Sequence, residues 1–213
     1  MATYIGIILL VQTGVFGQTK LLTGNSRYNF KLYGNLEKVD EEGFLTIEGV
    51  EITDRKSNQL IQTIKPDTKF VNPNNYEPLK IIDINYDGNQ DFILISGNGQ
   101  YEDILYDFYI FDKNTDQFKK WEKEFNGGAN LINVRPVFDA VNKTIKTYWH
   151  NTDTFQKTSV FKLHNDNYQL VEEYNQELDN ETNGKYLITT HKKVIEGKLR
   201  LIDLEMIPLQ KDE

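Results

Sequence analysis

The stretch Lys198-Leu-Arg-Leu-Ile-Asp-Leu-Glu-Met206 decides the fold class, because polar and apolar side chains alternate along its nine positions apart from the adjacent pair Leu201-Ile202. A period of two is typical of a strand with one buried face. The turn Glu196-Gly197 precedes this stretch, and the run Tyr186-Leu-Ile-Thr-Thr190 lies upstream of the turn. Two such runs around a glycine-containing turn predict an antiparallel hairpin.

The rest of the chain repeats this pattern of short strand-like runs separated by turn residues. Residues 28–33, 44–53 and 60–64 are rich in aromatic and β-branched side chains. Residues 116–125 and 170–178 fit either a short helix or a strand, and we prefer strands for both. The sequence therefore predicts an all-β protein of antiparallel sheets, in a β-sandwich or a propeller-like arrangement. We expect residues 66–78, which contain Pro66, Pro73 and Pro78, to form a loop.

Two pairs of aromatic residues are separated by seven positions around a polar turn. Phe111 and Phe118 form one pair, and Phe161 and Tyr168 form the other. In a hairpin this spacing can bring the two rings together across the strand pair, although any hairpin with an Asn/Asp turn has a similar appearance.

The composition limits the functional classes. The chain has 213 residues, of which 38% are hydrophobic and 26% charged, as in ordinary globular proteins. The net charge of −8 argues against non-specific nucleic-acid binding, which needs clustered Lys and Arg, and it fits a cationic partner. Because the chain has no Cys, it has no disulfides, no thiol catalysis and no thiolate metal site.

Residues 1–17 carry no charge and are centred on the apolar run Tyr4-Ile-Gly-Ile-Ile-Leu-Leu-Val11. This run is too short to span a membrane stably and has the length of a signal-peptide core. We expect residues 1–17 to be a signal peptide, residues 18–213 to form a single β domain, and the protein to be periplasmic or secreted. The alternative is that the apolar run forms a first buried strand or a frayed terminus.

The strongest chemical signal is the loop Asp83-Ile-Asn-Tyr-Asp-Gly-Asn-Gln-Asp91. Side-chain oxygens at its first, third and fifth positions suit a tight coil around a hard cation, and Gly88 suits the backbone reversal. Without a cation, three carboxylates would be crowded into one turn. We predict a Ca²⁺ site whose ligands are Asp83, Asn85, Asp87, Asn89 and Asp91.

The loop differs from an EF-hand, because its twelfth position is Leu94 and the flanking runs are strand-like rather than amphipathic helices. Water or a distant carboxylate such as Glu102 or Asp103 must complete the shell. Mg²⁺ fits less well because it demands a tight octahedron. The alternative is an Asx-rich turn that binds no metal.

The stretch from Val50 to Tyr174 resembles a family of bacterial periplasmic proteins built around such a calcium loop. The resemblance rests on Val50-Glu-Ile-Thr-Asp54 followed by Leu60-Ile-Gln62, on the loop itself, and on Tyr106-Asp-Phe-Tyr-Ile-Phe-Asp112 leading to Phe118. Known members inhibit lysozyme-like peptidoglycan hydrolases as immunity proteins, and they are similar to the periplasmic inhibitor of invertebrate-type lysozyme. The resemblance implies metal binding by the loop, and inhibition only at the level of the family.

We therefore expect an exported calcium-binding protein that blocks a secreted peptidoglycan hydrolase or another cationic protein. Tyr101, Glu102 and Asp103 form a candidate inhibitory plug, for which the alternative is an ordinary hairpin connection. Motifs of nucleophilic, zinc and nucleotide-dependent enzymes are missing, so we expect no enzymatic activity. The rival function is an envelope protein that binds a glycan or an adhesion partner through exposed aromatic residues.

Overall fold

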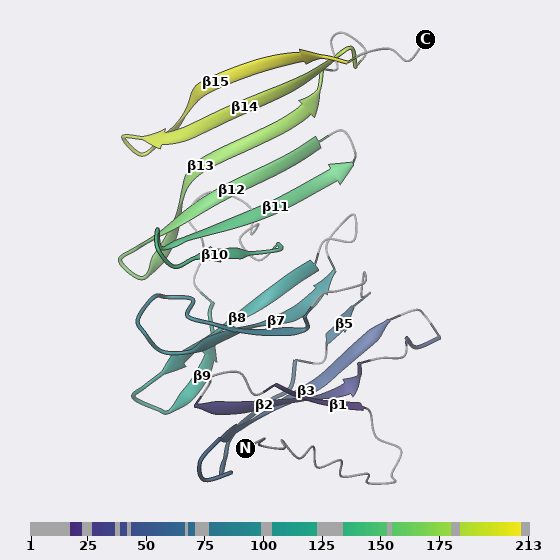
Figure 1. Ribbon diagram of the computed structural model, residues 1–213, viewed down its shortest axis with the longest axis vertical. Coiled ribbons are helices and arrows are strands. Elements are labelled where there is room, and N and C mark those ends of the chain that lie inside the picture. The colour runs from purple at the N-terminus through teal and green to yellow at the C-terminus, as the bar shows by residue number, and fades with distance from the viewer. Residues whose placement is uncertain are drawn as a thin grey trace, which may run out of the picture.

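The computed structural model describes residues 18–22, 27–36, 39–41, 44–66, 68–70, 77–98, 104–122, 134–152, 155–179 and 184–209. Every regular element in these ranges is a β-strand, which confirms the all-β prediction. The strands form three antiparallel sheets that follow one another along the long axis (Figure 1). None of the three sheets closes into a barrel within the described ranges, and the arrangement is consistent with a β-sandwich.

The first sheet, sheet A, is built on the long hairpin of β2 and β3. Its strands are β1 (Gln18–Leu22), β2 (Tyr28–Asn35), β3 (Leu45–Asp54), β4 (Leu60–Ile64) and β5 (Thr68–Phe70), in the order β1-β2-β3-β4 with β5 also paired to β3. The expectation of a loop over residues 66–78 is wrong at β5. Thr68 and Phe70 are buried while Lys69 is exposed, so this three-residue segment follows the strand period.

The second and third sheets, sheets B and C, are simple meanders in chain order. Sheet B contains β6 (Leu79–Ile82), β7 (Asp91–Asn98), β8 (Ile104–Asp112) and β9 (Gln117–Lys120). Sheet C contains β10 (Val137–Asp139), β11 (Thr144–Thr152), β12 (Phe155–His164), β13 (Asn167–Leu178), β14 (Tyr186–Ile195) and β15 (Lys198–Pro208). β13 confirms the preference for a strand over residues 170–178, and β9 confirms it over residues 117–120 of the other ambiguous stretch, where residues 121–122 are irregular.

The hydrophobic core lies mainly between sheets A and B. The rings of Phe30 and Phe92 are 5.2 Å apart, and both contact Phe118 edge-on. Fully buried Ile145 and Tyr168 carry the same core into β11 and β13 of sheet C. At the far end of sheet C every residue of β15 is exposed, so the core ends before the last hairpin.

No helix among the described residues is long and apolar enough to cross a bilayer. Residues 1–17, which we expect to be a signal peptide, lie outside the described ranges.

Candidate metal centre

The acidic loop joins two paired strands of sheet B. Ile82, the last residue of β6, pairs with Asp91, the first residue of β7, so residues 83–90 must reverse the chain within a short span. Tyr86 and Gly88 both adopt left-handed backbone conformations, with φ of 55° and 86°. A Cβ added at Gly88 would meet no atom within 4 Å. Glycine is therefore favoured there by the backbone conformation and not by lack of space.

Side-chain oxygens at the first, third and fifth loop positions all turn back onto the loop. The carboxylate of Asp83 accepts hydrogen bonds from the backbone N–H groups of Asp87 (3.1 Å) and Gly88 (3.0 Å). The Asn85 side-chain oxygen accepts from the same Asp87 N–H at 3.2 Å, and Asp87 Oδ1 accepts from the N–H of Asn89 at 2.8 Å. The structure thus brings Asp83, Asn85 and Asp87 together, as the spacing predicts.

Hydrogen bonding favours the ionised form of Asp87. Burial acts against ionisation, but the hydrogen bonds from Asn89 and Asn85 hold the pKa of Asp87 below its usual range. The carboxylate is therefore available as an anionic oxygen ligand at neutral pH.

Asp91, the ninth loop position, is fully buried and ties the loop to two strands. Its Oδ2 accepts from the N–H of Ile84 and its Oδ1 from the N–H of Phe111 in β8, both at 2.8 Å. Burial raises the pKa of Asp91 to about 7, although the backbone amides of Phe111, Ile84 and Asn85 act to lower it. Asp91 is thus a structural clamp, and its expected role as a direct or water-mediated ligand stays a prediction.

Two tyrosines connect the loop to sheet C. The hydroxyl of Tyr168 in β13 donates to the carbonyl oxygen of Ile84 at 2.6 Å, and the hydroxyl of Tyr86 donates to the carbonyl of Thr144 in β11 at 3.0 Å. Burial raises the pKa of Tyr168, so its hydroxyl remains a donor. No local sequence signal marks either contact, because each joins residues 58 or more positions apart.

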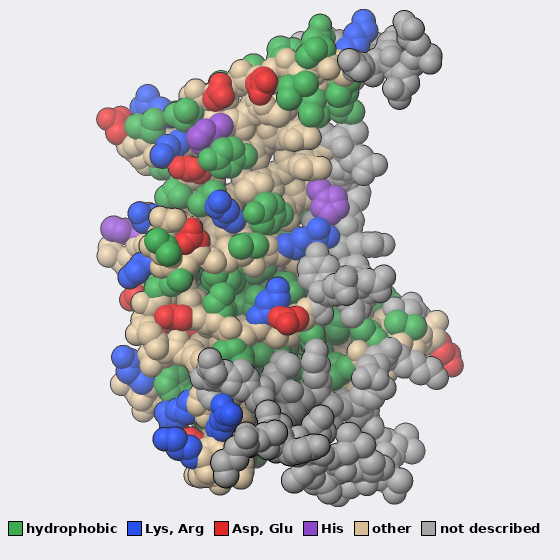
Figure 2. All heavy atoms as spheres, in the orientation of Figure 1, with side chains coloured by type: hydrophobic (Ala, Val, Ile, Leu, Met, Phe, Trp, Pro, Cys, Tyr) green, Lys and Arg blue, Asp and Glu red, His purple; other side chains and the backbone are tan. Residues whose placement is uncertain are grey.

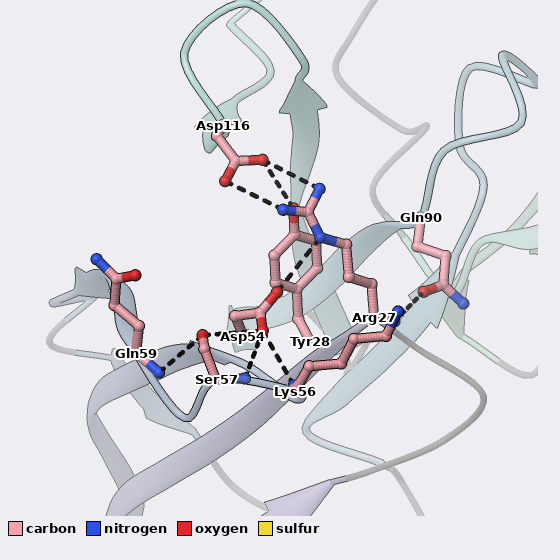
Figure 3. Close-up of polar contacts among 8 residues, drawn as sticks. All are labelled: Arg27, Tyr28, Asp54, Lys56, Ser57, Gln59, Gln90 and Asp116. Carbon is pink, nitrogen blue, oxygen red and sulfur yellow. Dashed lines mark hydrogen bonds and ion pairs between the residues drawn. The ribbon is translucent and has the colours of Figure 1, made fainter.

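Arg27, just before β2, connects the loop to sheet A (Figure 3). Its backbone N–H donates to the side-chain oxygen of Gln90, the eighth loop position, at 3.2 Å. Its guanidinium lies 3.2 Å from Asp116 in the β8–β9 turn and 3.5 Å from Asp54 at the end of β3. Tyr28 also donates to Asp116, and burial is the main reason that the pKa of Tyr28 rises to about 12. The loop therefore contacts all three sheets.

The donor set fits a hard cation. All its side-chain donors are carboxylate or amide oxygens, which suit Ca²⁺. In the described ranges no three acidic or histidine side chains converge on one point, so carboxylates alone do not form the site. A cation here would take mixed Asp and Asn oxygens, and Ca²⁺ binding stays a prediction.

The candidate plug residues Tyr101, Glu102 and Asp103 lie outside the described residues, so neither their inhibitory role nor a ligand role is tested.

A separate hollow of about 340 Å³ lies on sheet C. The Tyr174 and His191 rings stack there at 4.3 Å, and the Tyr174 hydroxyl donates to Glu172 at 2.8 Å. Lys193, and then Tyr174, hold the pKa of Glu172 below its usual value. Most of the lining is amide, hydroxyl or aromatic: Gln156, Thr158, Tyr174, Asn175, Gln176, Thr189, Thr190, His191 and Asp203.

Comparisons with known proteins support the fold more than the function. No protein-family model and no curated protein matches the chain. One similar solved structure is that of a Xanthomonas type IV secretion system related protein, with a TM-score of 0.59 and 15% sequence identity. The match covers 88% of this chain and 98% of that chain. At this identity the similarity shows a shared fold and no more.

Proposed function

We propose that this chain is an exported, non-enzymatic, calcium-binding protein that binds and inhibits a lysozyme-like peptidoglycan hydrolase as an immunity protein. The observation that carries the proposal is the acidic loop at the meeting point of three sheets. Its spacing is the one by which the sequence resembles the inhibitor family, and its contacts with three sheets suit the rigid centre of a binding scaffold. The fold is shared with a secretion-system-related protein, which is compatible with a role in self-protection.

Calcium would act on the loop as a structural ion. Asp83, Asn85 and Asp87 would hold it, with Asn89 and Asp91 nearby, and the cation would neutralise the repulsion between their carboxylates. A fixed loop would in turn fix Tyr86 against sheet C and Gln90 against Arg27. The proposed inhibitor therefore depends on calcium through the rigidity of its scaffold.

The net charge supports a cationic target. A protein with a net charge of −8 attracts a positively charged hydrolase and accelerates their encounter. This steering is screened by salt, so inhibition should set in faster at low than at high ionic strength.

The test is to mix the purified protein with a panel of muramidases in millimolar calcium and measure cell-wall lysis. We expect complete inhibition of at least one enzyme at a one-to-one molar ratio, and reduced inhibition by Asp87→Ala. Glu48→Ala, which removes an exposed carboxylate from β3, is the matched control and should inhibit fully. Failure to inhibit any muramidase would contradict the proposal.

A second candidate is an envelope protein that binds a glycan without inhibiting a hydrolase. The hollow on sheet C favours it, because Tyr174 offers a ring that is 41% exposed beside amide and hydroxyl groups. Retention on peptidoglycan that is lost in Tyr174→Ala, with no inhibition of any muramidase, would support this candidate over the first.

A further inference from the structure

The last strand, β15, is an apolar edge strand at the end of sheet C. It pairs with β14 on one side only, and no other described strand pairs with it. Its large apolar side chains are exposed to solvent: Leu201 is 54%, Leu204 51% and Met206 48% exposed. Figure 2 shows hydrophobic side chains beside acidic and basic ones at this end of the molecule. An edge of this kind offers unpaired backbone groups to another strand.

A bulge at Ile202 sorts the side chains of β15 into a charged face and an apolar face. His191 pairs with Asp203, and Lys192 pairs with Leu201, so Ile202 has no partner on β14. Because paired residues share a face and side chains alternate along β14, Arg200 and Asp203 lie on the same face. By the same register Lys198 and Glu205 join that face, and the opposite face holds Leu199, Leu201, Leu204 and Met206.

The charges on that face are arranged so that the strand complements itself. The basic residues Lys198 and Arg200 come first, and the acidic residues Asp203 and Glu205 follow at mirrored positions about the bulge. An antiparallel copy of the strand, centred between Leu201 and Ile202, places Lys198 opposite Glu205 and Arg200 opposite Asp203. The same register places Leu199 opposite Leu204 on the other face.

We propose that β15 pairs with β15 of a second copy, joining two C sheets into one continuous sheet around a two-fold axis. Charges and bulges on edge strands ordinarily oppose pairing. Here the bulge is what brings both signs of charge to one face, where a two-fold axis matches them. Across the new pair Leu199 of one strand would contact Leu204 of the other, whereas a foreign strand would need the reversed order of charges.

The test is the molar mass of the purified protein in solution, measured by light scattering and sedimentation over a range of concentrations. We expect the wild-type protein to reach twice the mass of the purified chain, which is 24.9 kDa for all 213 residues and lower once residues 1–17 are removed. In the double variant K198E/R200E all four charged residues on this face of β15 are acidic. Each half of the interface would then hold four negative charges, so this variant should be a monomer. The fourfold variant K198E/R200E/D203K/E205K reverses every pair and should restore the dimer.

The matched control is K146E/K162E, which makes the same change of net charge at exposed positions of β11 and β12. It should remain a dimer. A wild-type protein that stays monomeric at every concentration would overturn the proposal and leave the edge for a different partner. A dimer that survives in K198E/R200E, or a fourfold variant that stays monomeric although folded by circular dichroism, would overturn it as well.

Discussion

The hydroxyl of Tyr168 lies 2.6 Å from the carbonyl oxygen of Ile84, and this hydrogen bond joins β13 of sheet C to the acidic loop of sheet B. Both residues are fully buried, so neither group can exchange its partner for water. The position of the loop therefore depends on a contact between residues 84 positions apart.

Tyr168→Phe should destabilise the protein, because it removes the donor and leaves the Ile84 carbonyl buried without this partner. The expected cost is about 1–3 kcal/mol, or roughly 2–4 °C in melting temperature for each kcal/mol in a chain of this size. The ring contact with Trp121 is retained. Thermal unfolding of this variant beside Tyr148→Phe, which alters an exposed tyrosine, checks the expectation. Equal melting temperatures for the two variants would contradict it.

Asp87→Ala should abolish the effect of calcium on stability, because it removes an anionic oxygen at the centre of the loop. For the wild-type protein, calcium at about one hundred times its dissociation constant should add about 2.7 kcal/mol to the free energy of unfolding. Melting curves in calcium and in chelator measure this difference. We expect Glu48→Ala to keep the calcium response. A wild-type curve that is the same in both solutions would reject the metal site.

Asp91→Ala should destabilise the protein even in chelator, because it removes both acceptor oxygens of the clamp. The Ile84 and Phe111 N–H groups are then left buried without these partners, at a cost of about 1–3 kcal/mol for each. Burial raises the pKa of Asp91 to about 7, so the carboxylate itself is costly to bury, and its removal offsets part of this loss. Glu48→Ala, at an exposed position of β3, is the control. Urea unfolding of both variants in chelator makes the comparison. Equal losses for the two variants would show that Asp91 is not the clamp.

Local pattern was sufficient to predict the longer strands but not the short ones. The alternation from Lys198 to Met206 became β15, and residues 28–33 became most of β2. The segment Thr68–Phe70 was missed because three residues are too few to show a period, and its burial comes from pairing with β3.

The aromatic pairs show how turn length limits such predictions. Phe111 and Phe118 are cross-strand partners with ring centroids 5.3 Å apart, as their spacing predicts. Phe161 instead pairs with Leu170, because the turn between His164 and Asn167 has two residues whereas the turn between Asp112 and Gln117 has four. A separation of seven residues places two rings opposite each other only when the turn has the right length, and sequence spacing alone does not give that length.

The candidate site likewise combines contacts that the sequence predicts with contacts that it does not predict. The spacing of Asp83, Asn85 and Asp87 was enough to predict that their oxygens gather in one coil. The clamp from Asp91 to Phe111 and the tyrosine contacts with sheet C arise only when distant strands pack together. Their residues carry no local signal for these roles.

Glu173→Gln should destabilise the protein at neutral pH but not in strong acid. Glu173 is a buried residue of β13 whose carboxylate faces Lys157 in β12 and lies 3.7 Å from Lys192 in β14. Burial acts to raise its pKa, but hydrogen bonds from Lys157 and Asn175 outweigh burial and hold the pKa of Glu173 below 4.5. Removing one partner of a buried ion pair costs about 3–5 kcal/mol, and the partial exposure of both lysines reduces the expected loss to about 1–2 kcal/mol.

The pH dependence follows from the sign of this shift. Because the folded pKa is lower than the unfolded value of 4.5, the stabilisation is fully present above that value. It is lost as the pH falls through the lower folded value, where the carboxylate is protonated in both states. Urea unfolding of the wild type and Glu173→Gln should therefore differ at pH 7 and converge in acid. Glu177→Gln, an exposed position four residues further on the same face, should match the wild type throughout. A Glu173→Gln deficit that persists unchanged in acid would show that packing, and not the ion pair, is responsible.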